Sequence, residues 1–121
     1  AWRHFLRQRF RSLLVLEEDL VFSPDLLWYF AQLEPVLLRD PSLLCASAWS
    51  DMGLAPYAGD LTVVLRTEWF SGFGWLMPLD TIRGELLPQW PDNFGDLSWR
   101  TWLRGWGRHC LVPEVPRLAF A

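Results

Sequence analysis

This 121-residue sequence has no long hydrophobic segment: no apolar run approaches the ~20 residues that a helix needs to cross a bilayer. No secretory signal peptide is visible in these residues either. The chain starts at Ala1, without a methionine, directly in a helical pattern. We therefore expect a fragment or excised segment of a longer protein, with no membrane contact from the segment itself.

The sequence also lacks an excess of positive charge. Its formal net charge is -3, and no basic stripe is interleaved with aromatic residues, so nucleic acid is not an expected partner. A group of arginines near the start is expected to form the solvated face of one helix. These are Arg3, Arg7, Arg9 and Arg11. His4 and His109 lie too far apart in sequence for a ligand-spaced cluster, so zinc is not expected.

Several catalytic signatures are absent as well. We find no glycine-rich phosphate loop, no nucleophile elbow and no Cys-x-x-Cys motif. The cysteines are limited to Cys45 and Cys110. Such a pair would be bridged in a secretory compartment and would remain as two buried thiols in the cytosol, and the residues alone leave both outcomes open.

The residues that are present indicate a globular chain. Hydrophobic residues make up 51% and charged residues 21%, which argues against disorder, and the length corresponds to one domain at most or to part of one. The nine tryptophans are unusually many for this length. Indole rings stack well on the apolar faces of sugars, although for any single tryptophan core packing is the favoured interpretation.

The spacing of apolar and turn-forming residues predicts a series of helices and strands. The expected elements are a helix over 2–10, a strand over 13–16, a helix over 23–40, a strand over 43–49, a loop over 52–60, a strand over 61–65, a tight turn over 71–74 before the apolar 75–77, a short helix after Asp80 that ends before Pro88, a helix within 97–106 and an extended segment over 112–117. The unbroken apolar run 13–16 suits a strand buried on both faces, as in a parallel sheet. Ser23 is the expected N-cap of the next helix. This order of elements indicates an α/β fold.

The run Glu17-Glu18-Asp19 follows the first predicted strand immediately. On a strand, Glu17 and Asp19 would point one way and Glu18 the other. A strand that ends here places carboxylates at the carboxyl edge of the sheet, where open α/β folds bind ligands. Such oxygens suit Mg²⁺ or Mn²⁺, with a substrate diphosphate completing the coordination shell. From the run alone, a solvated acidic turn beside a helix N-terminus is an equal alternative.

The acidic run is part of an ordered series of distinctive blocks. They are Leu16–Leu20, Ser23–Asp25, Cys45–Asp51, Arg66–Phe70, Gly72–Leu76, Glu85–Pro91 and Pro113–Arg117. Over nearly the whole chain this series resembles the second half of the catalytic domain of the N-acetylglucosaminyltransferase I family. The resemblance implies that residues 1–121 are the C-terminal portion of a GT-A glycosyltransferase domain, an α/β fold with a Rossmann-like mixed sheet.

The same resemblance implies an inverting transfer of GlcNAc from UDP-GlcNAc to O2 of an alpha-mannose on a glycoprotein N-glycan. The related O-mannose beta-1,2-N-acetylglucosaminyltransferases share most of the blocks, so an O-mannosyl acceptor is an alternative. A non-catalytic homologue or fragment that keeps the fold is another. The segment alone is expected to be inactive, because the family's upstream nucleotide-binding part is missing from it.

The resemblance also assigns roles to individual residues. In the family the last acid of the triplet binds Mn²⁺ directly, and Asp19 holds that position. Glu17 matches the first acid, and Glu18 replaces a middle Asp with a side chain one methylene longer; both are expected near the nucleotide sugar. Phe73 lies in the turn that lines the donor sugar site in the family. Core packing is the expected role of Trp75.

The expected catalytic base is Asp96. Counting without gaps from Trp90 to Cys110 places Asp96 on the family's base, although the Trp before it and the Asp after it are Gly and Leu here. A competing alignment anchored on Trp99 would place Arg100 on the base and predict an inactive enzyme. Asp96 could alternatively be a helix N-cap, a role compatible with catalysis.

The resemblance implies a disulfide between Cys45 and Cys110, because both fall on family positions that are joined by a disulfide. It also implies that the parent protein works in the Golgi lumen and is a single-pass type II membrane protein.

Overall fold

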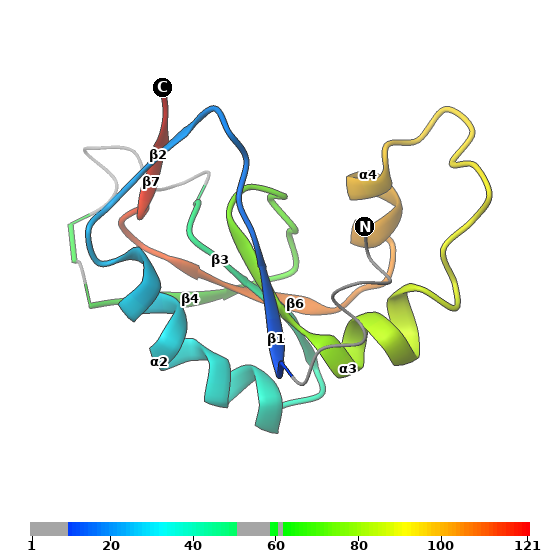
Figure 1. Cartoon of the computed structure of the whole chain (residues 1–121), viewed down its shortest axis with the longest axis horizontal. Helices are drawn as coiled ribbons and strands as arrows, with labels where there is room; N and C mark the ends of the chain where they lie inside the picture. Colours follow the sequence, from blue (N-terminus) through cyan, green and yellow to red (C-terminus); the bar gives the residue numbers. More distant parts are fainter. Residues whose placement is uncertain (1–9, 51–58, 61) are drawn as a thin grey trace.

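The computed structural model describes residues 10–50, 59–60 and 62–121 (Figure 1). The helix expected over 2–10 and most of the loop expected over 52–60 lie outside these ranges. The elements are β1 Ser12–Val15, β2 Leu20–Phe22, α2 Leu26–Arg39, β3 Leu43–Ser47, β4 Val64–Thr67, β5 Trp75–Pro78, α3 Leu79–Thr81, the π-helix η1 Ile82–Leu86, α4 Trp99–Arg104, β6 His109–Pro113 and β7 Leu118–Phe120.

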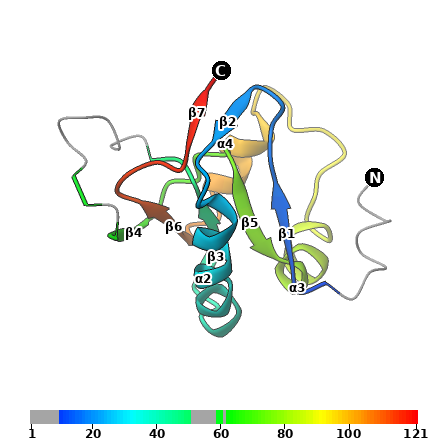
Figure 2. The same ribbon diagram turned by 60° about the vertical axis from the view of Figure 1, so that its left-hand side comes forward.

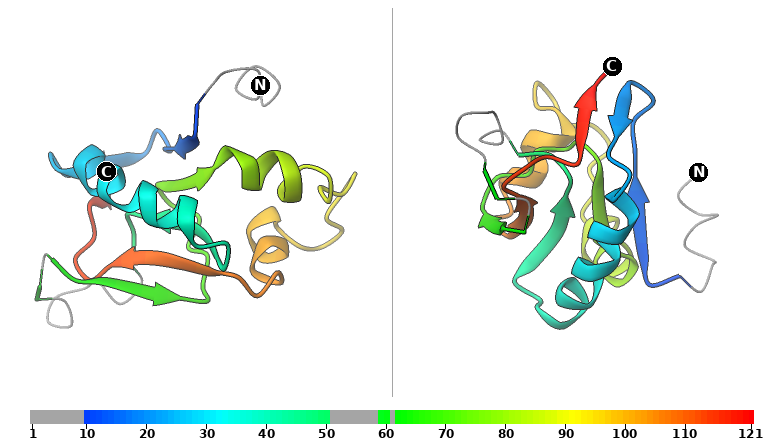
Figure 3. Two further views of the ribbon diagram at one scale, coloured as in Figure 1. Left: turned by 90° about the horizontal axis from the view of Figure 1, so that it is seen from below. Right: turned by 90° about the vertical axis from the view of Figure 1, so that its left-hand side faces the viewer.

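The strands form a mixed sheet, as the α/β prediction requires. Five strands lie in the order β1-β5-β3-β6-β4. Within the described residues, β3 and β6 are parallel, whereas the pairs β1–β5, β3–β5 and β4–β6 are antiparallel. Figure 3 shows β4 beside β6, at the outer edge of the sheet. A separate antiparallel pair, β2 with β7, lies close to the C-terminus (Figure 2).

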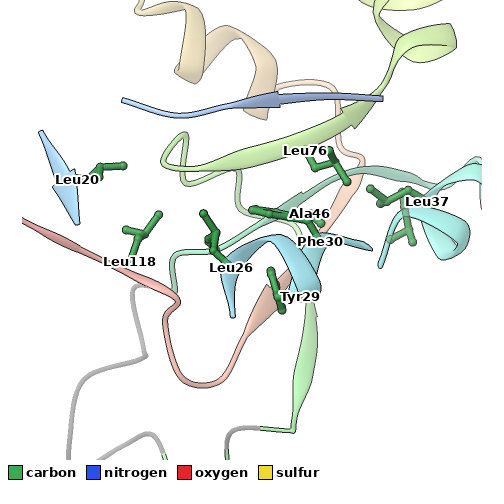
Figure 4. Packing of buried hydrophobic residues seen from close by; sticks show 10 residues of the cluster. Leu20, Leu26, Tyr29, Phe30, Leu37, Ala46, Leu76 and Leu118 are labelled. Atoms are coloured by element: carbon green, nitrogen blue, oxygen red, sulfur yellow. The ribbon is translucent and has the colours of Figure 1, made fainter. Parts of the chain in front are cut away.

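Helices cover both faces of the sheet because alternate residues of a strand point to opposite sides. On β5, Leu76 belongs to a core cluster with α2, whereas Trp75 and Met77 belong to a second cluster with α3, η1 and α4. The first cluster is shown in Figure 4, where Leu26 and Phe30 of α2 are among the labelled side chains. The hydroxyl of Tyr29, also on α2, donates to the carbonyl of Ser47 at 2.6 Å.

The prediction for the first strand was wrong about both its pairing and its burial. β1 is neither parallel nor buried on both faces: it is an edge strand, antiparallel to β5, and all four of its residues are half-buried. Leu14 packs on the α2 cluster, and Leu13 and Val15 pack on the other cluster. An unbroken apolar run indicates that both faces of a strand contact apolar side chains. It does not indicate which strand is the neighbour in the sheet, or in which direction that neighbour runs.

The helix α2 begins later than predicted, and its start is tied to the end of the chain. Asp25, not Ser23, holds the N-cap position, and the Ser23 hydroxyl donates to the Asp25 carboxylate. Arg117, which is 7% exposed, donates from Nε to Asp25 Oδ2 at 2.9 Å. The Ser23 hydroxyl, followed by the Arg117 guanidinium, holds the pKa of Asp25 below its ordinary value. The backbone of Arg117 also bonds to Ser23 and Ala48, so this residue joins α2, β3 and the β6–β7 connection.

The start of one other helix differs from the prediction, whereas the helix expected within 97–106 is confirmed as α4. The helix before Pro88 begins at Leu79, and Asp80 lies inside its first turn without capping it. In α4 the N-cap is Ser98, whose hydroxyl oxygen accepts from the backbone N–H of Thr101 at 3.1 Å. The alternative role of Asp96 as a helix N-cap is therefore wrong.

The expected third strand lies further along the chain, at Val64–Thr67 rather than over 61–65. Ahead of it, the Asp60 carboxylate accepts the backbone N–H and the hydroxyl of Thr62, which forms a turn where the strand was expected to start.

A disulfide joins Cys45 on β3 to Cys110 on β6, the pair that the resemblance implies. The two residues face each other in the parallel register, with Cα atoms 4.7 Å apart, and both are buried. The bridge therefore crosses the centre of the sheet. Within the described residues, no helix is both long and apolar enough to span a membrane.

Candidate functional site at the carboxyl edge of the sheet

The acidic run lies at one edge of the sheet. Val15, at the end of β1, and Ser47, at the end of β3, both pair with Trp75, the first residue of β5. Glu18 and Asp19 form a turn immediately beyond this edge, and Ala121 donates its backbone N–H to the carbonyl of Asp19 at 2.9 Å. The carboxylates therefore follow the carboxyl end of β1, next to the carboxyl end of the central strand β3.

The three acids differ in their surroundings. Glu17 is half-buried, whereas Glu18 and Asp19 are exposed. Because Glu18 and Asp19 are in a turn, the alternation of side chains expected along a strand does not apply to them. Within the part of the chain that the structure describes, Glu17 is the one of these three acids whose carboxylate is held by side-chain and backbone groups of the site.

Glu17 is held from two sides. Its Oε2 accepts the backbone N–H of Gly74 at 3.1 Å, and its Oε1 lies 3.9 Å from Nη2 of Arg100. The side chains of Glu17 and Arg100 are 22% and 32% exposed, so the ion pair is only partly open to water. Both carboxylate oxygens face a donor, and this fixes the orientation of the group.

Arg100 reaches this position because the turn before β5 contains glycine. Gly72 adopts a φ of +80°, and a Cβ placed there would lie 2.3 Å from Nε of Arg100. The carbonyl of Gly72 accepts from Nε and Nη2 of Arg100, each at 3.4 Å. A side chain at position 72 would therefore displace the guanidinium from the site.

Aromatic rings surround the same guanidinium. Cζ of Arg100 lies 4.7 Å from the ring centroid of Trp99 and 5.6 Å from that of Phe73. The Phe73 ring in turn contacts Phe120, at 5.2 Å between centroids, and Trp49, at 6.3 Å. Glu17 and Phe73, both predicted from the sequence, therefore come together around Arg100, which was considered only as a rival to the base.

Asp96 occupies a different environment. It is exposed, in the loop that precedes α4, directly after Gly95 with a φ of +62°. Among the described residues, no hydrogen bond or ion pair links Asp96 to the acidic run. The structure brings Arg100, the residue that the competing alignment places on the base, next to Glu17 instead.

The donor atoms of the acidic turn are of the kind that Mn²⁺ and Mg²⁺ prefer. Glu18 and Asp19 present exposed carboxylate oxygens, and these ions are commonly held by one or two carboxylates together with substrate phosphates. Over residues 10–50, 59–60 and 62–121, no group of three or more His, Cys, Asp or Glu side chains could hold a metal. The residues present therefore fit an ion that the substrate helps to coordinate, not one enclosed by protein ligands.

A mixed α/β sheet with an acidic turn at its carboxyl edge is an arrangement in which α/β proteins bind their ligands. The chain belongs to the GNT-I family, which it matches over residues 2–120. It is also similar, at 32% identity over 117 residues, to an alpha-1,3-mannosyl-glycoprotein 2-beta-N-acetylglucosaminyltransferase of Arabidopsis thaliana. That alignment covers 93% of this chain and 25% of the relative, so the chain spans about a quarter of the relative's length.

Proposed function

We propose that the full-length protein carrying this sequence is a metal-dependent inverting glycosyltransferase with a GT-A fold. It transfers GlcNAc from UDP-GlcNAc to O2 of an alpha-mannose on a glycoprotein N-glycan. The observation that carries this proposal is the acidic turn at the carboxyl edge of the sheet, with Glu17 held by Gly74 and Arg100, in a chain of the GNT-I family. The name of the Arabidopsis relative supports the same transfer.

In this proposal each residue of the site has a distinct task. Asp19 provides the metal-binding carboxylate, and Glu18 lies beside it in the same exposed turn. Glu17, oriented by Gly74 and Arg100, accepts hydrogen bonds from the donor sugar or ribose. Phe73 provides an apolar wall of the same site. Mn²⁺, when bound, supplies Lewis-acid stabilisation of the departing diphosphate.

Asp96 is the proposed general base, which accepts the proton of the attacking mannose hydroxyl. Its exposed position at the end of a loop leaves it open to an acceptor that arrives from solvent. One observation favours the alternative of a non-catalytic homologue. The competing alignment places Arg100 on the family's base, and the structure places this residue beside Glu17 in the site. A guanidinium cannot act as a base. An O-mannosyl acceptor is the other alternative.

We expect Asp96→Asn in the full-length protein to lower kcat about a hundredfold or more, because a positioned base typically contributes at least that factor. The binding of the donor should change little. The measurement is Mn²⁺-dependent transfer of GlcNAc to mannose-terminated N-glycan and O-mannosyl acceptors. The matched control is Asp92→Asn, which changes another exposed acid of the same loop.

Three outcomes of this experiment separate the alternatives. Full activity of Asp96→Asn would remove Asp96 as the base. Absence of transfer by the wild-type protein on every acceptor would favour the non-catalytic homologue. Transfer to the O-mannosyl acceptor alone would replace the proposed acceptor class.

The contact between Arg100 and Glu17 leads to a second prediction. If Arg100 acts through Glu17, then Glu17→Gln and Arg100→Met should each weaken UDP-GlcNAc binding about fivefold, corresponding to about 1 kcal/mol for a charge-assisted contact. The double variant should bind no worse than the weaker single variant. Dissociation constants measured by titration calorimetry on the full-length protein test this coupling.

The control for this cycle is Arg104→Met. Arg104 lies one turn further along α4, with its guanidinium over the Trp69 ring and its Nε bonded to the carbonyl of Phe70. The Arg104→Met variant loses a cation–π contact and a hydrogen bond to a carbonyl, as Arg100→Met does. Because Arg104 does not contact Glu17, the affinity for UDP-GlcNAc should be unchanged. Additive effects of the Glu17 and Arg100 substitutions would show that Arg100 does not act through Glu17.

The compartment is part of the proposal. A buried disulfide persists in an oxidising environment, so the Cys45–Cys110 bridge supports a location in the Golgi lumen. The type II membrane anchor of the parent and the inactivity of the isolated segment are proposed from the family resemblance.

A further inference from the structure

A pocket of about 380 Å³ opens beside the candidate donor site. It is lined by residues that follow β3, by residues of β4 and β6, and by the segment between β4 and β5. Its lining residues are Trp49, Ser50, Leu65, Arg66, Thr67, Trp69, Ser71 and Val112. Trp49 links this tryptophan pocket to the donor side, because its ring is in edge contact with that of Phe73. Ser71 provides a second link, since it directly precedes Gly72, the carbonyl partner of Arg100.

The main wall of the tryptophan pocket is Trp69, which is 50% exposed. Cζ of Arg104 lies 3.7 Å from the centroid of its ring and covers one face. The Arg104 Nε donates to the carbonyl of Phe70 at 2.8 Å, and this fixes the guanidinium in place. The surface that Trp69 offers to solvent is therefore its remaining face and edge, on a ring that is already oriented. A preoriented indole face is a suitable surface for the apolar C–H groups of a sugar ring.

The pocket has the hydroxyls of Ser50, Thr67 and Ser71 and the guanidinium of Arg66, and none of the described residues that line it carries a carboxylate. The Thr67 hydroxyl oxygen accepts the backbone N–H of Trp69 at 3.1 Å, and no described residue accepts the hydrogen of that hydroxyl. The guanidinium of Arg66 is bonded to His109, Asp40 and Ser42. The pocket therefore suits an uncharged ligand that is rich in hydroxyls, and it does not suit a metal-bound diphosphate.

We propose that the tryptophan pocket binds one hexose ring of the acceptor glycan, stacked on Trp69, with the Thr67 hydroxyl donating a hydrogen bond to a sugar oxygen. This inference rests on the proposed transferase function. The acceptor, not the donor, is the occupant because the carboxylates suited to a metal-bound nucleotide are grouped around the acidic turn, whereas the described part of the pocket lining has none. The pocket volume is close to the lower limit for small-ligand sites, which suits one or two sugar rings.

The test is Trp69→Ala in the full-length protein. Loss of the stacking surface should raise KM for a mannose-terminated oligosaccharide about tenfold, while KM for UDP-GlcNAc stays unchanged. Trp69→Phe should restore part of the acceptor affinity, because it keeps an aromatic face. Thr67→Val should raise the acceptor KM less, by about threefold. The control is Trp28→Ala, which removes a 71% exposed indole from α2 and should change neither KM.

Direct binding keeps this inference separate from the proposed function. Saturation-transfer NMR with the same oligosaccharide, without the donor, reports acceptor binding even if the wild-type protein transfers no GlcNAc. Binding that Trp69→Ala abolishes and Trp28→Ala preserves would support the pocket in either case. An unchanged acceptor KM in Trp69→Ala, an equal rise in both KM values, or oligosaccharide binding that does not depend on Trp69 would each overturn the inference.

Discussion

Replacing Asp19 by alanine in the full-length protein is expected to lower Mn²⁺-dependent GlcNAc transfer about a thousandfold. A metal that acts as a Lewis acid supplies several kcal/mol of transition-state stabilisation, and each ~1.4 kcal/mol is a factor of ten in rate. Asp19 is exposed in a turn whose backbone is fixed by Ala121, so the substitution removes a carboxylate without disturbing the core. The measurement is the initial rate of transfer as a function of Mn²⁺ concentration.

A matched control distinguishes loss of the metal from a general loss of acidic charge. Asp80→Ala removes an exposed acid at the far end of β1 from Asp19. Asp80 lies there because it follows Pro78, which pairs with Ser12 at the start of β1. We expect this variant to keep wild-type activity. Calorimetric titration with Mn²⁺ in the presence of UDP should show binding to the control variant and much weaker binding to Asp19→Ala. Full Mn²⁺-dependent activity of Asp19→Ala would refute the assignment of the metal site.

Removing the disulfide is expected to have the largest effect on stability. The bridge closes a loop with a sequence separation of 65, which corresponds to about 4 kcal/mol in the chain-entropy model. The double substitution Cys45→Ala with Cys110→Ala should therefore lower the free energy of unfolding by about that amount. Urea titrations followed by tryptophan fluorescence measure the change.

Two comparisons isolate the contribution of the covalent bond. Both cysteines are in the buried cluster beneath α4 and η1, so the alanine variant also loses the packing of two sulfur atoms. Reduced wild-type protein keeps those atoms and loses only the bridge. It should account for most of the destabilisation of the double variant. If oxidised and reduced wild-type proteins unfold at the same urea concentration, the bridge makes no contribution to stability.

The local elements could be predicted from the sequence to different degrees. The apolar stripe of α2 includes Leu26, Phe30, Leu33 and Leu37, and the structure places all four in or against one core cluster. The exact start of the helix could not be predicted, because Asp25 is engaged by Arg117 from the far end of the chain. A partner 92 positions away leaves no signal in the local pattern.

The candidate site shows the same division. Glu17 was identified through its position in the acidic run, and Phe73 through a turn that resembles that of the family. Arg100 as the partner of Glu17 was missed, since it depends on the absence of a side chain at Gly72 and on the docking of α4. A glycine followed 28 positions later by an arginine could have suggested the contact only after the fold was known.

Residue types and their spacing were enough to indicate the α/β class, the acidic run after the first strand and, through the ordered blocks, the family to which the chain belongs. These properties depend on residue type, on short-range periodicity and on spacing along the chain. The folded chain was needed to show that β1 is an antiparallel edge strand, that Arg100 and not Asp96 lies beside Glu17, and that Arg104 covers one face of Trp69 at the wall of a pocket. Each of these depends on contacts between segments distant in sequence, which are established only when both faces of the sheet are packed.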